Sequence, residues 1–129
     1  MKKIATLIAI VIFSSIGFAQ SGAKIEFKDK NNTIDYGNIT KENDNGIRAF
    51  EFTNTGDSPL VIFSIQSTAG FTILSKPKDS ILPGKTAKIE VKYNMAPGPI
   101  RKTITVESNA VNYDEGRIPL KIKGEVVVN

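Results

Sequence analysis

A serine followed three residues later by a lysine is the first stretch of this chain that could do chemistry. Ser75 and Lys78 have the S-x-x-K spacing that supplies the nucleophile of serine β-lactamases. That motif needs the start of a helix and two partner motifs, whereas here Pro77 lies in a polar loop and neither partner occurs. The residues therefore predict a loop at this point and no catalytic serine.

The run Gly84-Lys85-Thr86 matches the end of a phosphate-binding loop. The full pattern, G-x-x-x-x-G-K-[ST], requires a glycine where this chain has Asp79, and it requires a helix to follow. The residues after Thr86 alternate between apolar and charged types, as in a strand. Pro83-Gly84 is therefore interpreted as the centre of a type II turn that leads into a strand.

Oxygen-bearing side chains recur at every second position from Asp29 to Asp35, as they do in calcium-binding loops. An EF-hand would also require glycine and glutamate where the chain has Ile34 and Thr40, so an EF-hand is excluded. A calcium loop of another kind stays open, because Ca²⁺ asks only for about six to eight oxygen ligands. Ordinary turn-forming residues are the alternative interpretation.

The chain contains no histidine, no cysteine and no tryptophan. Without histidine and cysteine, the common nucleophile–base pairs and the usual zinc and copper ligands are missing. The carboxylates are scattered over outward strand positions and turns. We therefore predict no enzyme activity, no catalytic or metal-binding residue and no cofactor. A cryptic hydrolase is the less favoured alternative, and it would need two carboxylates close together in a deep pocket.

The first 19 residues have the three-part form of a secretory signal peptide. Two lysines precede an uncharged run over residues 4–18, and the small residues Gly17 and Ala19 stand at the −3 and −1 positions of a cut after Ala19. A membrane-spanning helix needs about 20 apolar residues, which is longer than this run. We predict cleavage between Ala19 and Gln20.

The predicted mature chain, residues 20–129, forms one domain. Loss of the two signal lysines lowers its formal net charge from +4 to +2. Its basic residues alternate with apolar ones and do not cluster, so no nucleic-acid partner is expected. No membrane span is expected after cleavage. A domain without disulfides must be stabilised by burial, for which this length suffices because chains above about 40 residues seldom need covalent staples.

After the signal, apolar and polar residues alternate with the period of β-strands. Turn residues separate the runs: Asn43 to Gly46 predicts a tight hairpin, while Asn54 to Pro59 and Pro97 to Pro99 predict further turns. No window outside the signal predicts an amphipathic helix. The pattern predicts an all-β, immunoglobulin-like antiparallel β-sandwich of seven to eight strands. Its recognisable strands are expected over residues 24–28, 33–40, 47–53, 60–65, 86–94, 102–108 and 117–127.

For two strands, the sequence also predicts the position in the sheet. Residues 60–65 are apolar on both faces, which predicts a central strand that is covered on both sides. Pro119 lies within the last run and predicts an edge strand, because proline cannot donate to a strand ladder. Aromatic residues on apolar strand faces are expected in the core, namely Phe27, Phe50, Phe52, Phe63 and Tyr93.

Several stretches, taken in order, resemble the bacterial domain-of-unknown-function family 1573. They are FEFTNTGDSPLVI (50–62), LPGK (82–85) and KTITVESNA (102–110), with IDYGNI (34–39) before them and IKGEV (122–126) after them. The resemblance implies an immunoglobulin-like fold similar to Hydin-type and major-sperm-protein-like domains. It also implies export, no enzyme activity and no settled ligand.

The chain departs from that family at one place. The family typically carries Cys-Gly-Cys-Thr where this sequence has Ala69-Gly70-Phe71-Thr72, so Gly70 and Thr72 are kept and both thiols are gone. A thiol, metal or covalent role of those cysteines cannot be transferred. Phe71 is interpreted as a buried apolar plug in preference to an exposed contact, since large aromatics contribute most when buried.

The residues and the resemblance together predict an exported, non-enzymatic binding or structural module of the bacterial envelope, in the periplasm or at the cell surface. Its expected partners are envelope or surface proteins, because the edge of a sandwich can bind a partner strand. A carbohydrate-binding module is the alternative, and it would need exposed aromatic rings. The weak binding candidates are Tyr36, Phe71, Thr72 and Tyr113.

Overall fold

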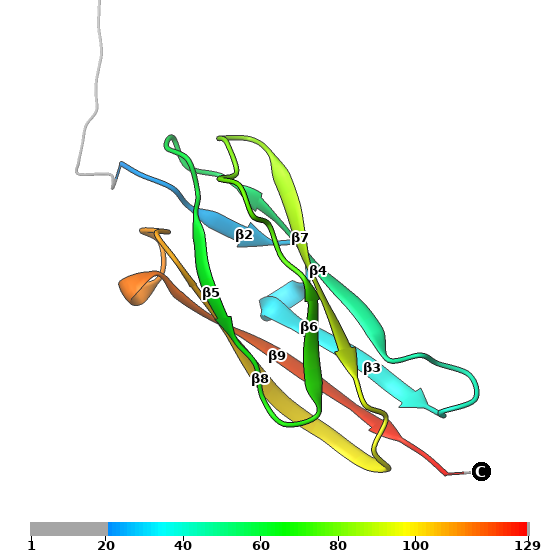
Figure 1. Cartoon of the computed structure of the whole chain (residues 1–129). Coiled ribbons are helices and arrows are strands. Elements are labelled where there is room, and N and C mark those ends of the chain that lie inside the picture. Colours follow the sequence, from blue (N-terminus) through cyan, green and yellow to red (C-terminus); the bar gives the residue numbers. More distant parts are fainter. Residues whose placement is uncertain (1–20, 129) are drawn as a thin grey trace, which may run out of the picture.

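Two four-stranded sheets face each other across a shared core in the computed structural model, which describes residues 21–128 (Figure 1). The predicted signal peptide and its cut between Ala19 and Gln20 lie outside the described residues. The first sheet has the order β2 (Ile25–Phe27), β4 (Ile47–Asn54), β7 (Thr86–Tyr93) and β6 (Phe71–Ser75). The second has the order β3 (Thr33–Ile39), β9 (Arg117–Val126), β8 (Gly98–Ser108) and β5 (Ile62–Gln66).

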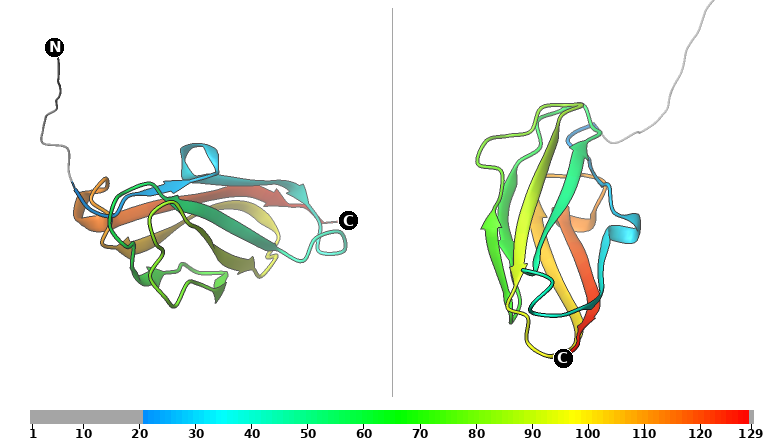
Figure 2. Two further views of the ribbon diagram at one scale, coloured as in Figure 1. Left: turned by 90° about the horizontal axis from the view of Figure 1, so that it is seen from above. Right: turned by 90° about the vertical axis from the view of Figure 1, so that its right-hand side faces the viewer.

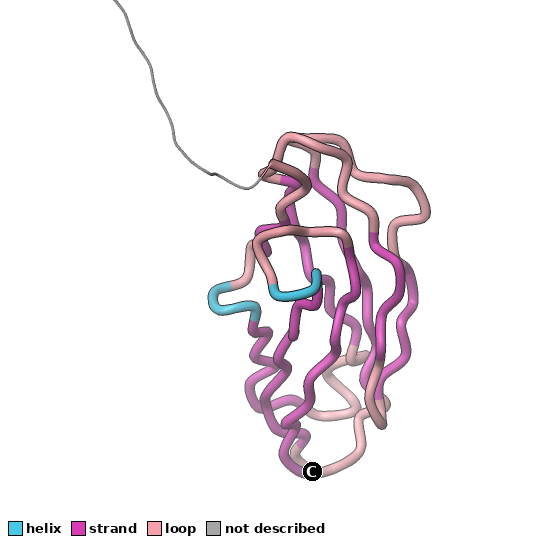
Figure 3. Tube along the Cα trace, turned by 90° about the vertical axis from the view of Figure 1, so that its left-hand side faces the viewer, coloured by secondary structure: helices cyan, strands magenta, loops and turns pink. Residues whose placement is uncertain are grey.

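Helical structure within residues 21–128 is confined to two short 3₁₀ turns, η2 (Lys30–Asn32) and η3 (Asp114–Gly116) (Figure 3). Each contains a residue with positive φ, Asn31 at 55° and Glu115 at 54°, so neither can extend into a longer helix. No helix in this described part is long and apolar enough to cross a membrane.

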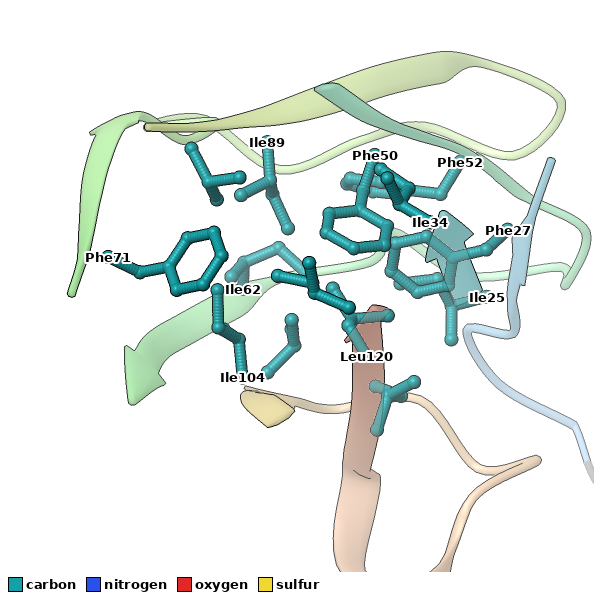
Figure 4. Packing of buried hydrophobic residues seen from close by; sticks show 14 of the residues in the cluster. Ile25, Phe27, Ile34, Phe50, Phe52, Ile62, Phe71, Ile89, Ile104 and Leu120 are labelled. Atoms are coloured by element: carbon teal, nitrogen blue, oxygen red, sulfur yellow. The ribbon is translucent and has the colours of Figure 1, made fainter. Parts of the chain in front are cut away.

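The predicted alternation is confirmed in the paired strands. In the antiparallel β4–β7 pair, Phe50 lies opposite Ile89 and Phe52 opposite Ala87, so the apolar side chains of both strands share the inner face. These inner faces form the core, in which Phe27 contacts Phe50 edge-on at a centroid distance of 6.2 Å (Figure 4). The immunoglobulin-like β-sandwich predicted from the sequence is therefore confirmed.

One strand pair differs from the antiparallel expectation. β3 and β9 run parallel, with Ile34 opposite Ile122 and Ile39 opposite Val126. Five strands separate the two in sequence, so no hairpin sets their relative direction. That direction follows from the path of the chain between the two sheets, which the local pattern does not encode.

The prediction of a central strand at residues 60–65 is wrong, because β5 is an edge strand. Its register with β8 pairs Ile62 with Ser108 and Ser64 with Glu107, which leaves Phe63 as an additional, bulged residue. The bulge shifts the alternation by one residue, so Ile62 and Ile65 both lie toward the core although they are three residues apart. Phe63 is 62% exposed and does not belong to the core, contrary to expectation.

The prediction of an edge strand around Pro119 is also wrong. β9 lies between β3 and β8. The pairing with β3 begins only at Lys121, however, so at Pro119 the sole paired neighbour of β9 among the described strands is β8. The missing donor of proline is therefore tolerated at a point where the inner strand has one free side.

Two of the predicted turns differ from expectation. Asn43 to Gly46 does not close a hairpin, because it joins β3 to β4 and these strands belong to different sheets. Gly98 and Pro99 belong to the start of β8 and not to a turn. The type II turn at Pro83-Gly84 is confirmed, because Gly84 has a φ of 82° and the Lys85 N–H donates to the Leu82 carbonyl at 3.0 Å.

Candidate functional site

Two of the four weak binding candidates come together, but inside the core. Tyr36 is 5% exposed and Phe71 is 7% exposed, and their ring centroids lie 6.4 Å apart. Tyr36, a weak binding candidate, is therefore not exposed to a ligand, whereas the buried position of Phe71 agrees with an apolar plug. Tyr93 completes the cluster, with its centroid 4.7 Å from that of Phe71. Thr72, the next residue of β6, is exposed and lies opposite Lys92.

Tyr36 is held by contacts on both its polar end and its ring face. Its hydroxyl donates to the Gly46 carbonyl at 2.6 Å, and the Arg48 guanidinium lies 4.1 Å from the ring centroid. Asp44 fixes that guanidinium through two hydrogen bonds, of 3.1 and 2.7 Å. The bond from Arg48 lowers the pKa of Asp44 below its usual value, while burial raises the pKa of Tyr36 to about 12. The cluster is a satisfied part of the core and offers no ring to a ligand.

Tyr113 lies apart from these rings and is half-buried. Its hydroxyl accepts a hydrogen bond from Asn32 Nδ2 at 2.9 Å, and its ring packs against the core. Of the three aromatic residues on which a carbohydrate platform would depend, Tyr113 alone has substantial exposure. Within residues 21–128, the aromatic side chains thus do not form the exposed platform that a carbohydrate-binding module would need.

The stretches that could do chemistry occupy ordinary structural positions. Ser75 Oγ donates to Glu90 Oε1 at 3.0 Å on the exposed surface, and no hydrogen bond joins it to a lysine among the described residues. Gly84 to Thr86 forms the turn before β7, and a strand follows it. Thr33 Oγ1 donates to the Asn31 carbonyl, and Asp35 Oδ1 accepts from the Gly37 N–H.

Among the described residues, the acidic side chains do not gather in a deep pocket. Asp114 and Glu115 border an open hollow of about 690 Å³ within the 108–116 loop, but both are exposed neighbours in the chain. Within residues 21–128, no group of three or more acidic side chains is placed to hold a metal ion.

A different feature emerges at the flank formed by β5 and β6. These consecutive strands are the edges of different sheets and lie on the same flank of the sandwich (Figure 2, right). A backbone pair between Leu60 and Ile81, with both hydrogen bonds at 2.8 Å, closes one end of this flank. The turn at Gly70 closes the other end. Between these ends no backbone hydrogen bond joins the two strands in the described chain.

Both strands at this flank carry a β-bulge, and each bulged residue is a large exposed apolar one. In β6, Ile73 pairs with Val91 and Ser75 with Glu90, which leaves Leu74 as the additional residue, just as Phe63 is in β5. Leu74 is 46% exposed. A hollow of about 530 Å³ lies beside it. We call this region the open flank, and define it by Phe63 and the residues that line the hollow, namely Ile65, Ile73, Leu74, Ser75, Lys76 and Lys78.

The opposite flank is closed by comparison. The Asn112 side chain accepts from the Ile25 N–H at 3.1 Å and donates to the Ile25 carbonyl at 2.9 Å, so it occupies the edge of β2 as a neighbouring strand would. The exposed side chains of β3 at this flank include the polar Asp35 and Asn38. Exposed apolar residues on edge strands are therefore concentrated at β5 and β6.

The open flank does not follow from regular alternation along the sequence. Residues 71–75, which form β6, were not expected as a strand, and residues 60–65 were expected at the centre of a sheet. The signal that could have found the flank is the break in alternation within each stretch, where Phe63 follows Ile62 and Leu74 follows Ile73. Two adjacent apolar residues in a short strand are consistent with a bulge as well as with burial on both faces.

Comparisons with known proteins agree on the fold. The profile of the family described as "Protein of unknown function (DUF1573)" matches residues 25–126. No curated protein matches the sequence. A Porphyromonas gingivalis W83 protein of unknown function superimposes with a TM-score of 0.65 at 18% identity. The match covers 92% of this chain and 54% of that one, so the chain spans about half the length of that structure.

Two other solved structures are similar at low identity. The Vibrio cholerae VesB protease has a TM-score of 0.61 at 14% identity, over 80% of this chain and 32% of the protease chain. PapD-like domain 7 of human CEP192 has a TM-score of 0.57 at 12% identity, over 91% of this chain and 94% of that domain. At these identities the likeness shows a shared immunoglobulin-like, PapD-like fold and nothing about activity.

Proposed function

This chain belongs to the DUF1573 family of proteins of unknown function, and we propose that it is an exported, non-enzymatic protein-binding module of the bacterial envelope whose partner docks at the open flank. The observation that carries the proposal is the pair of edge strands whose bulges expose Phe63 and Leu74 on one flank. Single exposed apolar residues are common on protein surfaces. Apolar residues gathered on strands with an unpaired edge, beside a hollow, are instead typical of interaction sites.

The strand edges support the same proposal. An unpaired edge presents backbone donors and acceptors to any passing strand, and natural proteins usually block it with charge, with proline or with a cover. Here β2 is covered by Asn112, whereas β5 and β6 keep uncovered edges. A bulge discourages indiscriminate pairing while it re-aims a side chain, so the flank combines protection with a specific apolar contact.

The binding proposal is tested by capture of partners from the native envelope fraction. The bait is the purified chain, used as wild type, as Leu74→Asp and as Leu82→Asp. Leu82 is 54% exposed and lies outside the hollow, so its variant matches Leu74→Asp in chemistry and exposure. We expect a partner that wild type and Leu82→Asp capture and Leu74→Asp loses. Absence of a specific partner, or a partner that all three baits capture equally, contradicts the proposal.

Export is tested separately by N-terminal sequencing of the protein made in its own cells. The charged start, apolar run and small residues before Gln20 support cleavage by signal peptidase. We expect the envelope protein to begin at Gln20. A protein that keeps Met1 contradicts cleavage, and a protein found only in the cytoplasm contradicts export.

A further inference from the structure

Resting on the proposed function, we infer that the occupant of the open flank is an extended segment of a partner protein that alternates apolar and acidic side chains. The segment lies along β6, with an apolar side chain in the hollow and a carboxylate at the lysines beyond the end of the strand.

The apolar requirement follows from the residues that line the hollow. Ile65 and Ile73 lie toward the core but stay half-buried, because no further strand covers them at this flank, and Leu74 stands beside them. The hollow of about 530 Å³ lies within the range of about 300–1,000 Å³ that is typical of ligand sites. An apolar side chain placed there would remove all three residues from water, which is the main source of affinity for such a contact.

The extended conformation follows from the boundaries of the flank. The Leu60–Ile81 backbone pair and the turn at Gly70 close its two ends, so the opening between them is bounded by β5 and β6 along its sides. β6 is five residues long and has an unpaired edge along this opening. A partner in extended conformation can follow that edge and present every second side chain to the hollow.

The acidic requirement follows from charge. Lys76 and Lys78 line the hollow, both are exposed, and neither forms an ion pair with any described residue. No carboxylate from the described part of the chain lines the hollow. A second copy of this chain would bring two more lysines to the same place, and like charges at a contact oppose association. Charge complementarity therefore favours an acidic partner segment over self-association.

The test measures peptide binding by fluorescence anisotropy with the purified chain. The probe is a fluorescein-labelled peptide of alternating glutamate and valine, compared with peptides of the same length that alternate lysine with valine or glutamate with serine. We expect the glutamate–valine peptide to bind at least about tenfold more tightly than either comparison peptide. Its affinity should fall as salt is added, because salt screens the attraction between charges. Equal binding of the lysine–valine peptide overturns the acidic requirement, and equal binding of the glutamate–serine peptide overturns the apolar one.

Matched variants locate the binding. We expect Leu74→Asp to lower the affinity for the glutamate–valine peptide by about tenfold or more. Leu82→Asp should change that affinity by less than about twofold. Charge reversal at Lys76 and Lys78 together is expected to have the same large effect, whereas reversal at Arg101 and Lys121, exposed on the other sheet, has little effect. Circular dichroism confirms the fold of each variant, and Leu74→Ser replaces Leu74→Asp if the latter does not fold.

Three results would separate this inference from the proposed function. A captured envelope partner that depends on Leu74, together with failure of the glutamate–valine peptide to bind, overturns the acidic segment and leaves the binding module intact. A peptide that binds equally to wild type and Leu74→Asp places the site elsewhere and overturns the inference. Concentration-dependent dimers of wild type that disappear in Leu74→Asp identify a second copy as the occupant and likewise overturn it.

Discussion

Asn54 connects more parts of the molecule than any local pattern around it indicates. The side chain is fully buried at the end of β4, and its Nδ2 donates to the carbonyls of Ser58 and Ile81, both at 2.8 Å. Its Oδ1 accepts from the N–H groups of Gly56 at 2.9 Å and Lys24 at 3.3 Å. One amide thus ties the turn after β4 to the segment after β6 and to the entry of β2.

Replacement of Asn54 by alanine is expected to lower the free energy of unfolding by about 3 kcal/mol or more. The reason is that buried backbone groups would lose their partners, and each such group costs about 1–3 kcal/mol. Equilibrium unfolding in urea measures the change. The control is Asn45→Ala. Asn45 Oδ1 accepts one exposed hydrogen bond from the Ile47 N–H, so its loss should cost about 1 kcal/mol or less. Equal losses in the two variants would contradict the role assigned to Asn54.

The burial of Tyr36 predicts a loss of stability at alkaline pH. Burial raises its pKa to about 12, above the usual value near 10, because the charged phenolate would be desolvated. The neutral tyrosine therefore stabilises the fold fully below about pH 10, and this contribution is lost as the pH rises through 12. We expect the unfolding free energy of wild type to fall more steeply than that of Tyr36→Phe between these pH values, as measured by urea unfolding.

The same variant gives a check at neutral pH. Tyr36→Phe removes the hydrogen bond to the Gly46 carbonyl but keeps the ring below Arg48, so it should cost about 1.5 kcal/mol or less at pH 7. Parallel alkaline profiles for wild type and Tyr36→Phe would show that this hydroxyl does not control the transition. Tyr93 and Tyr113 are present in both proteins and therefore cancel in the comparison.

At the scale of the strand, a single additional residue decides which side chains reach the core. In β5 and β6 the bulges at Phe63 and Leu74 change the face of every residue that follows. Regular alternation was sufficient to predict β4 and β7, where no register shift occurs. It was not sufficient for β5, because a local pattern cannot distinguish a bulged edge strand from a strand that is covered on both faces.

Gly116, in the β8–β9 connection, and Gly84, in the turn before β7, are expected to differ in the stability that each loses on substitution by alanine. Gly116 has a φ of 70°, and a Cβ there would overlap the carbonyl oxygen of Ser108. Gly84 has a φ of 82°, but no atom lies within 4 Å of its Cβ position. Gly84→Ala should therefore cost only the backbone strain of about 1–2 kcal/mol, whereas Gly116→Ala should cost about 3 kcal/mol or more.

Thermal or urea unfolding of both variants checks this prediction, and Gly84→Asn provides a further control. Asparagine tolerates the left-handed region better than alanine does, so Gly84→Asn should lower the free energy of unfolding least among the three variants. If Gly116→Ala lowered the free energy of unfolding no more than Gly84→Ala does, the β8–β9 hairpin would have to rearrange without loss of stability. That outcome would contradict the close approach of Gly116 to Ser108.

At the scale of the whole molecule, the topology predicts slow folding. The core depends on pairs that are distant in sequence, among them the parallel β3–β9 pair and the β2–β4 pair. Chains dominated by non-local strand pairs fold in about milliseconds to seconds. Stopped-flow refolding should show a main phase in this range, and complete refolding within microseconds would contradict the topology.

Much of the fold could be predicted from the residues, but little of the candidate site could. The strand runs, the type II turn at Pro83-Gly84 and the inward faces of β4 and β7 followed from alternation and turn chemistry. The aromatic residues chosen as binding candidates were chosen for residue type alone, and Tyr36 and Phe71 proved to be buried. Residue type does not distinguish a core ring from a contact ring, because both are amphipathic or apolar.

The sequence by itself determined that this protein is built from strands, where most of them begin and end, and which chemistries lack their side chains. These properties depend on local alternation, on turn residues and on composition, which are all readable along the chain. Only the tertiary structure decided which strands are edges, that β3 and β9 run parallel, and that Phe63 and Leu74 lie on one open flank. The reason is that sheet order and register are set by contacts between distant residues, whose combined burial outweighs any local preference.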